Sequence, residues 1–490
     1  MRAGGNSIPL KGGDFTVDAQ LYYEGQWLDG VEMQRFTVEN PATNQVIGTA
    51  VSASLKDLDR IIGSAEKGSS IWAKTLANER ARALKRVASL IRDHQDELAL
   101  LLTQEEGKAI GEARSEIGTG ADFFDFYAAE ALRTYGTTMP SPSPSRSIWT
   151  TRSPIGVSAL ITPWNYPFST ICRKMAPALA AGCSVIVKPA EETPLIASKL
   201  IEIIHAVNLP KGVVNFVTGD PQLIGTNLVA DPRVRKVSFT GSTEIGRTIL
   251  HNAADNITSV SLELGGNAPV IIFDDASIDD AVQGIIRCKF RNAGQVCLAT
   301  NRIYVQLNVL SQLRERLHQA VNALQVGDGT RQNVQMGPLI NQQAIDKVSH
   351  HVADATAKGA TIECGGEAIP GAGYFYTPTI LSNASETMTL AHEETFGPVA
   401  PLFTFDTEDE VYERANGTPY GLVAYVFTKN LARAMRAIGA LDFGVVGVND
   451  PGPSLVEAPL GGVKASGLGR EGGHEGIEEF LETKYVSMRY

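Results

Sequence analysis

One cysteine of this chain has polar neighbours that a purely structural cysteine rarely has. Cys297 ends the segment FRNAGQVC, in which Asn292 and Gln295 are polar. A reactive thiol needs a lowered pKa and a nearby base. Glu263 ends the apolar run SVSL and is a candidate base, because burying a carboxylate without a purpose is costly. The pair would suit nucleophilic chemistry, and the spacing alone leaves open the alternatives of a small buried apolar cysteine and a salt-bridged surface glutamate.

The segment SFTGSTEIGRT allows a second chemistry, which is phosphate binding. Gly241 and Gly246 bracket a turn that opens a helix, and helix N-termini bind phosphate groups. The segment is close to a P-loop but has Arg247 in place of the lysine, and Glu244 would repel phosphate. The later run PVIIFDD resembles the strand that holds magnesium in P-loop enzymes. Nucleotide binding, a P-loop nucleotide hydrolase and a plain strand–turn–helix therefore remain open on this segment alone.

Lys188 and Glu191 follow another apolar run, in the segment IVKPAEETP. An acidic side chain at such a position accepts hydrogen bonds from ribose hydroxyls in dinucleotide-binding folds. The alternative is a solvated helix start, since a glutamate in a first turn also favours the helix dipole.

Strands alternate with helices around these segments. Val/Ile-rich runs and helical stretches follow one another in the order PIGVSALIT, helix 168–182, CSVIVKP, helix 194–207, VVNFVTG, VRKVSFTG and helix 243–254. A second set comprises PVIIFDD, helix 277–289, RIYVQL, helix 309–323 and strands near 376–382, 422–428 and 443–449. This alternation predicts an α/β fold with doubly wound parallel sheets. Ligands bind beyond the carboxyl ends of such strands, where ITPWNYPF, IVKPAEETP, SFTGSTEIG and LELGGNAP lie.

Other parts of the chain give simpler patterns. The first fifty residues are rich in strand and turn signals, and apolar periodicity predicts helices over about 55–73 and 77–106. The Ser/Pro-rich tract 137–149 is the clearest loop-like segment, and a projecting arm there is consistent with its composition.

Composition limits the class of protein. With 490 residues the chain is long enough for two or three domains, and its net charge of −11 argues against nucleic acid as a partner. The longest uncharged stretch contains three prolines and does not predict a membrane helix. Five cysteines without a CxxC pair, and no visible targeting segment, predict free thiols in the cytoplasm.

Several motifs together identify a family. LELGGNAP, FRNAGQVC, TPWNYPF, KPAEETP, FTGSTEIG, EETFGPV and PLGGVKASGLGRE, spread from residue 162 to 471, resemble the aldehyde dehydrogenase superfamily. The resemblance implies an aldehyde dehydrogenase-like fold of two Rossmann-type α/β domains and a small β oligomerisation arm. It assigns 1–136 and 150–263 to dinucleotide binding, 264–455 to catalysis, and 137–149 with 472–490 to a homodimer or homotetramer. It outweighs both the P-loop reading and a catalytically silent relative, in which Cys297 or Glu263 would have been lost.

The resemblance also implies catalytic roles. Cys297 would attack the aldehyde as a thiolate, and the Asn165 amide with the Cys297 N–H would stabilise the oxyanion, each by about 3 kcal/mol. Glu263 would activate water as general base to hydrolyse the thioester. Lys174 matches a lysine thought to relay protons, with an ordinary surface lysine as the alternative. No metal is implied.

The implied cofactor is NAD, with NADP possible in such families. Lys188 and Glu191 would hold the adenosine ribose, and Glu191 would repel a 2′-phosphate. Gly241 and Ser242 would face the pyrophosphate at the start of the GSTEIG helix. The remaining positions implied to bind the cofactor are Thr162, Trp164, Asn165, Gly246, Leu264, Glu394 and Phe396.

Among these families the chain is most similar to succinate-semialdehyde dehydrogenases, in ICRKMAPALAAG and in the C-terminal tail. Arg173, Arg291 and Ser454 match the residues that bind the substrate carboxylate in succinate-semialdehyde dehydrogenases. Guanidinium groups suit a carboxylate because their forked donors match its two oxygens. Structural ion pairs are the alternative for the arginines. The loop NDPGPSLVEAPLGG is richer in proline, and Leu460 replaces the usual phenylalanine. Glutarate semialdehyde, a sulfonated aldehyde such as sulfolactaldehyde, or a broad range of aldehydes therefore remain alternative substrates.

Overall fold

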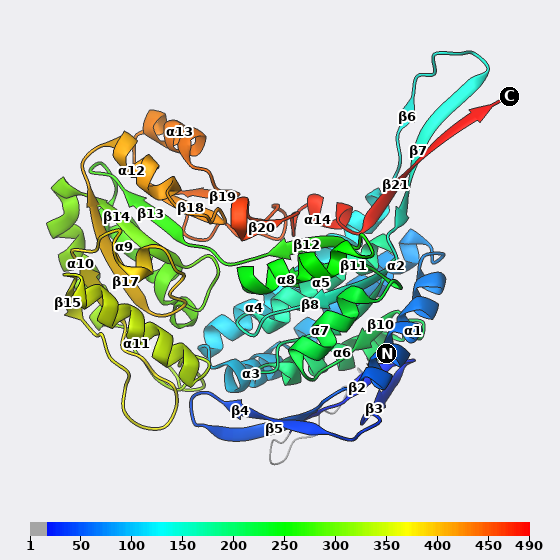
Figure 1. The fold of residues 1–490 in the computed structure, drawn as a ribbon, viewed down its shortest axis with the longest axis horizontal. Coiled ribbons are helices and arrows are strands. Elements are labelled where there is room, and N and C mark those ends of the chain that lie inside the picture. The colour runs from blue at the N-terminus through cyan, green and yellow to red at the C-terminus, as the bar shows by residue number, and fades with distance from the viewer. Residues whose placement is uncertain (1–16) are drawn as a thin grey trace, which may run out of the picture.

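The computed structural model describes residues 17–490, so residues 1–16 of the predicted dinucleotide-binding segment lie outside it. Its larger sheet has eight strands, in the order β20-β12-β11-β8-β9-β10-β2-β3 (Figure 1). The five central strands are parallel, as predicted. The strands are β2 (Leu21–Tyr23), β3 (Gln26–Leu28), β8 (Val157–Ile161), β9 (Ser184–Lys188), β10 (Val214–Phe216), β11 (Val234–Thr240), β12 (Ser259–Glu263) and β20 (Gly467–Leu468).

Helices cover both faces of this sheet because its central strands are apolar on both faces. Leu160 packs into one apolar cluster, whereas its neighbours Ala159 and Ile161 pack into another on the opposite face. Such doubly buried strands explain the continuous Val/Ile runs of the sequence. The helices are α1 (Leu55–Trp72), α2 (Ala77–Asp93), α3 (Gln95–Glu106), α4 (Ile110–Glu130), α5 (Pro167–Ala181), α6 (Pro194–Val207), α7 (Pro221–Ala230) and α8 (Thr243–Ala254). The single helix predicted over 77–106 was wrong, because the backbone leaves helical geometry at His94 (φ −111°, ψ 14°).

The second sheet has seven strands, in the order β15-β16-β17-β14-β13-β18-β19. These are β13 (Ala268–Ile272), β14 (Thr300–Gln306), β15 (Thr361–Cys364), β16 (Thr379–Ser382), β17 (Val399–Phe405), β18 (Val423–Phe427) and β19 (Val445–Val448). Its helices are α9 (Ile278–Ile285), α10 (Leu310–Asn322), α11 (Gln342–Ala357), α12 (Glu408–Asn416) and α13 (Leu431–Ala440). The predicted helix 277–289 changes to a π-helix over Ile286–Phe290, a form that is frequent at functional sites.

A three-stranded arm projects from the body and ends beside the C-terminus (Figure 1). It consists of β6 (Thr138–Met139), β7 (Arg146–Pro154) and β21 (Leu481–Arg489), with β7 paired along its length to β21. The loop-like tract 137–149 thus contains strand residues on both sides of a short turn. A smaller sheet joins β1 (Val17–Ala19), β4 (Arg35–Asn40) and β5 (Gln45–Val51). Among residues 17–490 no helix has the length and apolar character needed to cross a membrane.

Candidate active site

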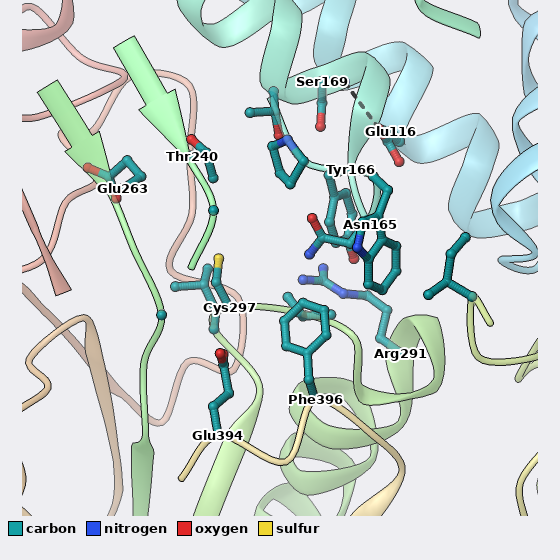
Figure 2. A pocket seen from close by; sticks show the side chains of 18 of the residues that line it. Glu116, Asn165, Tyr166, Ser169, Thr240, Glu263, Arg291, Cys297, Glu394 and Phe396 are labelled. Carbon is teal, nitrogen blue, oxygen red and sulfur yellow. Dashed lines mark hydrogen bonds between the residues drawn. The ribbon is translucent and has the colours of Figure 1, made fainter. Parts of the chain in front are cut away.

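A cavity of about 720 Å³ is lined by residues of both sheets' loops (Figure 2). Most of the predicted site residues line it: Trp164, Asn165, Arg173, Gly241, Ser242, Glu263, Leu264, Arg291, Cys297, Glu394, Phe396 and Ser454. Five others do not line it: Thr162, Lys174, Lys188, Glu191 and Gly246. The structure therefore gathers the predicted nucleophile, base and arginines in one cavity.

The four polar turns predicted near the ligand follow adjacent strands of the eight-stranded sheet. They come after β8, β9, β11 and β12, which neighbour one another in that sheet. Thr240 pairs with Glu263 and Ile161 pairs with Lys188, so the strand ends are level. The carboxyl-end rule thus holds for this half of the site.

The turn before α8 places a helix N-terminus against the cavity. Ser242 caps the helix by accepting a hydrogen bond from the N–H of Ile245 at 3.3 Å, and Gly241 precedes it at the cavity wall. At Gly246 a Cβ atom would lie 2.6 Å from Cδ2 of Leu264, so a larger residue there would require the Leu264 side chain to shift. The free N–H groups of this helix end suit an anionic group such as a pyrophosphate.

Cys297 lies at the other half of the site, just before β14, and is half-buried. In the segment that leads to Cys297, Asn292 and Ala293 have positive φ (49° and 52°). This backbone conformation costs a non-glycine residue about 1–2 kcal/mol. At Gly294 a Cβ would lie 2.2 Å from the carbonyl oxygen of Gly397, so glycine is required there. Three consecutive left-handed residues thus turn the chain so that Cys297 faces the cavity.

Burial raises the pKa of the Cys297 thiol to about 12, and the charges of Glu394 and Glu263 act in the same direction. Arg173 and Arg291 lower it. The thiolate therefore forms only when a base removes the proton or when negative charge is stabilised in the cavity.

Glu263 is one of the carboxylates that line the cavity. It ends β12 with 6% of its surface exposed, and its Oε1 accepts no hydrogen bond from the described residues. Burial, and then the charge of Glu471, raise the pKa of Glu263 well above its usual value. The alternative of a salt-bridged surface glutamate was therefore wrong.

Lys174 lies behind the cavity wall. It is 1% exposed, forms an ion pair with Glu471 and donates a hydrogen bond to Ser238 Oγ at 3.1 Å. Glu471 itself lines the cavity and raises the pKa of Glu263 through its charge. The ordinary surface lysine considered for Lys174 was wrong, because its side chain is buried and ion-paired with Glu471.

Asn165 follows β8 and points toward the Cys297 side of the cavity (Figure 2). Its Nδ2 donates to the carbonyl oxygen of Gln295 at 2.9 Å, two residues before the nucleophile. An amide nitrogen has two N–H groups, so one remains for a ligand.

Two arginines and a serine meet in the same cavity. Arg173 donates from Nη2 to Ser454 Oγ at 3.0 Å, and Arg291 lies over the Tyr166 ring, 5.5 Å from its centroid. The Nε groups of both arginines are buried without a hydrogen-bond partner in residues 17–490. Neither arginine forms the structural ion pair with a described carboxylate that was its alternative role. These free donors favour an anionic ligand, because unpaired buried donors are costly.

Polar groups gather at the ends of β8, β9 and β11, some of them lining the cavity and others beside it. Lys188 forms an ion pair with Glu191 at the end of β9, next to Thr162, whose N–H donates to the Lys188 carbonyl at 3.1 Å. The hydroxyls of Thr162 and Thr240 are buried without a hydrogen-bond partner among the described residues, and so have capacity for ribose or phosphate oxygens. The alternative of a glutamate in a solvated first turn was wrong, because α6 begins only at Pro194, after Glu191, and Lys188 is buried.

Two aromatic side chains and one acidic side chain line another part of the cavity. Trp164 and Phe396 meet edge to face, with centroids 5.6 Å apart, and Glu394 lies near them (Figure 2). Burial raises the pKa of Glu394 to about 7. The aromatic walls of this region are suited to a flat ring.

Sequence reasoning missed several residues of the site. Tyr166, Glu116, Arg287 and Glu471 line the cavity, and Lys108 lies beneath it. The motif TPWNYPF contained Tyr166, and Glu471 ended PLGGVKASGLGRE, so both were within matched segments. Lys108 and Glu116 lie in no motif, and only their contacts reveal them.

The P-loop alternative was wrong. A P-loop enzyme places its magnesium-binding aspartate on a strand of the same sheet as the phosphate loop, but β11 and β13 belong to different sheets. The aspartate after β13, Asp275, instead pairs with Arg433 and Thr428. Among the described residues no cluster of metal-ligating side chains occurs.

Comparison with known proteins agrees with this geometry. The profile of the Aldehyde dehydrogenase family matches residues 27–486. The chain is 46% identical to a succinate-semialdehyde dehydrogenase (NADP(+)) of Escherichia coli over 96% of this chain and 97% of that protein. It is 46% identical to a glutarate-semialdehyde dehydrogenase of Pseudomonas putida, with the same coverage. It is 44% identical to a 3-sulfolactaldehyde dehydrogenase of Pseudomonas putida, over 96% of each.

Solved structures of aldehyde dehydrogenases have nearly the same fold as this chain. A succinate-semialdehyde dehydrogenase from Burkholderia pseudomallei superposes with a TM-score of 0.96 and 43% identity, covering 97% of this chain and 98% of that one. A betaine aldehyde dehydrogenase of Staphylococcus aureus in complex with NAD+ superposes with a TM-score of 0.94 and 35% identity, covering 96% and 98%. The family match spans nearly the whole described chain, and the cavity is lined by both Cys297 and Glu263. The chain belongs to the aldehyde dehydrogenase family.

Proposed function

We propose that this protein oxidises an aldehyde that carries an anionic group at its far end to the corresponding acid. One observation carries the proposal: Arg173 and Arg291 present unpaired buried Nε donors in the cavity that also holds Cys297. An anionic group would satisfy these donors, and its aldehyde end would then extend toward the thiol. Tyr166 adds to this selectivity, because Lys108 and Arg291 both lie over its ring, so the ring is not free to receive a cationic substrate.

The reaction begins with the Cys297 thiolate, which adds to the aldehyde carbon and leaves a tetrahedral oxyanion. The free N–H of the Asn165 amide and the backbone N–H of Cys297 would donate to that oxygen. Loss of hydride from the carbon then converts the adduct to a thioester of Cys297. A nicotinamide dinucleotide supplies the hydride acceptor when it is bound.

Glu263 completes the reaction by taking a proton from water, which attacks the thioester and releases the acid, with the Cys297 thiolate as leaving group. The proton would pass from Glu263 toward Glu471 and Lys174, which are linked by an ion pair. Glu263 thus acts as general base in its ionised form.

The residues that would hold the dinucleotide surround α8 and the ends of β8 and β9. Gly241 and Ser242 would face the pyrophosphate, and the Lys188–Glu191 pair would bind the adenosine ribose. Trp164, Leu264, Glu394 and Phe396 would contact the nicotinamide half, and Gly246 lets the helix approach. We propose NAD as the main cofactor, because the Glu191 carboxylate repels a 2′-phosphate; relatives that bind NAD+ or NADP(+) make NADP the alternative.

Succinate semialdehyde is the proposed main substrate, since it carries a carboxylate at the distance of a short chain from its aldehyde. Glutarate semialdehyde and sulfolactaldehyde carry comparable anions, and relatives with those names are as similar to this chain. Leu460 and the proline-rich loop that holds Ser454 border the cavity and would set the accepted chain length.

The remaining assignments are proposals of the same kind. We propose that segments 1–136 and 150–263 bind the dinucleotide, that 264–455 supply the nucleophile, and that 137–149 with 472–490 join subunits of a homodimer or homotetramer. The projecting arm of β6, β7 and β21 supports the last assignment. We propose a cytoplasmic location, supported by five cysteines that are all free thiols within residues 17–490.

The proposed binding of the substrate anion by Arg173 and Arg291, here called the arginine clamp, makes a testable prediction. Replacing Arg291 by glutamine should raise the KM for succinate semialdehyde about 10- to 100-fold, because a charge-assisted hydrogen bond contributes about 1.5–3 kcal/mol. The kcat/KM for a neutral aldehyde of similar length, such as butanal, should change by less than about threefold, since it makes no such bond. Steady-state kinetics of wild type and Arg291→Gln on both aldehydes measures this. An equal loss on both substrates would contradict the clamp.

A further inference from the structure

Beneath the cavity, buried groups join the segment that carries Asn165 to the segment that carries Cys297. We propose that they form a positioning brace, which fixes the Asn165 amide against the nucleophile so that both meet the same oxyanion. The inference rests on the proposed function, because it concerns the oxyanion of that reaction. The brace consists of Glu106, Lys108, Glu116 and Asn292.

Lys108 is the centre of the brace. It lies between α3 and α4, is 1% exposed, and donates from Nζ to Glu116 Oε2 at 2.6 Å and to the Asn165 carbonyl oxygen at 2.7 Å. Its Nζ also lies 3.8 Å from the centroid of the Tyr166 ring. A fully buried ammonium is costly unless it is paired and hydrogen-bonded, so these contacts fix its place and hold the Asn165 backbone.

Glu116 holds the segment that follows Asn165. Its Oε1 accepts hydrogen bonds from the N–H groups of Phe168 at 3.0 Å and Ser169 at 3.1 Å, in the first turn of α5 (Figure 2). A carboxylate at a helix N-terminus is favoured by the helix dipole. Lys108 binds both Glu116 and the Asn165 carbonyl, and Glu116 binds the start of α5. The short turn from Asn165 to α5 is therefore held at both ends.

Asn292 connects the nucleophile segment to the same group. Its Nδ2 donates to Glu106 Oε1 at 2.7 Å and to the Asn165 carbonyl oxygen at 3.2 Å. Glu106 Oε2 in turn accepts from the backbone N–H of Lys108 at 3.0 Å. Asparagine tolerates the left-handed backbone at this position better than most residues. The Asn165 carbonyl oxygen thus joins the two segments from below, in addition to the hydrogen bond from the Asn165 amide to Gln295.

The same protein offers a matched control for buried carboxylates. Glu105 is 0% exposed and caps α6, accepting hydrogen bonds from the N–H groups of Leu195 at 2.6 Å and Ile196 at 2.9 Å. It therefore has the burial and capping role of Glu116 without a hydrogen bond to Lys108 or Asn165. A loss of stability shared by both variants would be structural, whereas a loss confined to Glu116 would reflect the brace.

The test compares Glu116→Gln with Glu105→Gln in two reactions of the Cys297 thiol, without dinucleotide or aldehyde. p-Nitrophenyl acetate acylates a thiol through a tetrahedral oxyanion and releases nitrophenolate, whereas iodoacetamide alkylates it by direct displacement of iodide without one. The brace predicts that Glu116→Gln slows acylation about 10- to 100-fold, since small misplacements of catalytic groups cost about 10²-fold. Alkylation should change by less than about threefold, and Glu105→Gln should leave both rates near wild type.

Asn292→Gly keeps the experiment decisive if Glu116→Gln fails to fold, because glycine retains the left-handed backbone and removes only the amide contacts. It should show the same split between acylation and alkylation. Acylation at the wild-type rate in the folded variants, or an equal fall in both rates, would overturn the brace. Since the wild-type protein reacts with the ester whichever aldehyde it oxidises, these outcomes are distinct from a failure of the proposed function.

Discussion

Replacing Cys297 by alanine is expected to lower aldehyde oxidation by at least about 10⁴-fold, because loss of a catalytic nucleophile costs at least this much. The side chain lines the cavity beside Glu263 and the arginines, and no other cysteine lines that cavity. Oxidation is followed as the absorbance of the reduced cofactor. Binding of the dinucleotide, measured by quenching of tryptophan fluorescence, should be unchanged, because the thiol forms no part of the α8 turn.

Cys288→Ala is the matched control for this variant. Cys288 is 5% exposed, and its Sγ donates a hydrogen bond to the Pro451 carbonyl oxygen at 3.2 Å. Cys288 does not line the cavity, so its thiol does not face the aldehyde site that Cys297 faces. We expect Cys288→Ala to retain activity within about tenfold of wild type. Any loss would come from the small cavity that the substitution leaves in the core. Substantial oxidation by Cys297→Ala would place the nucleophile elsewhere.

The second large effect concerns Glu263. The Glu263→Gln variant is expected to form one equivalent of reduced cofactor in a burst and then turn over about 10²- to 10⁴-fold more slowly, the usual contribution of a general base. Stopped-flow absorbance separates burst from steady state, and mass spectrometry should detect the thioester on Cys297. A variant without a burst would assign Glu263 to an earlier step.

The pH dependence follows from the same residue. Burial raises the pKa of Glu263 well above its usual value, and a general base acts only when deprotonated. Hydrolysis of the thioester should therefore accelerate as pH rises through that raised pKa, and the acceleration should be absent in Glu263→Gln. A pH profile of hydrolysis that is identical in wild type and variant would exclude Glu263 as the titrating base.

The sequence was most informative where a strand ends in a motif. Continuous apolar runs predicted β8, β9, β11 and β12. The turns after these strands lie together because the carboxyl ends of parallel strands meet at one edge of the sheet. Local signals also located α6 and α8 within the bounds now observed. Their proline and serine starts are strong helix signals.

The other half of the site does not follow that rule. Cys297 precedes β14, and Glu394 and Phe396 precede β17, so they lie at the amino ends of strands in the second sheet. Periodicity cannot show that this edge meets the carboxyl edge of the first sheet; only motif resemblance pointed there. Lys108 and Glu116 were not predicted, because an isolated lysine and glutamate have no pattern that distinguishes burial from exposure.

The most direct measurement is reduction of NAD and NADP by the purified protein with succinate semialdehyde, glutarate semialdehyde, sulfolactaldehyde and neutral aldehydes. The proposed function predicts that an anionic aldehyde gives the highest kcat/KM, with NAD preferred and with the activity lost in Cys297→Ala. Turnover of neutral aldehydes alone would contradict the arginine clamp. Reduction of neither cofactor by any aldehyde would contradict the proposed function itself.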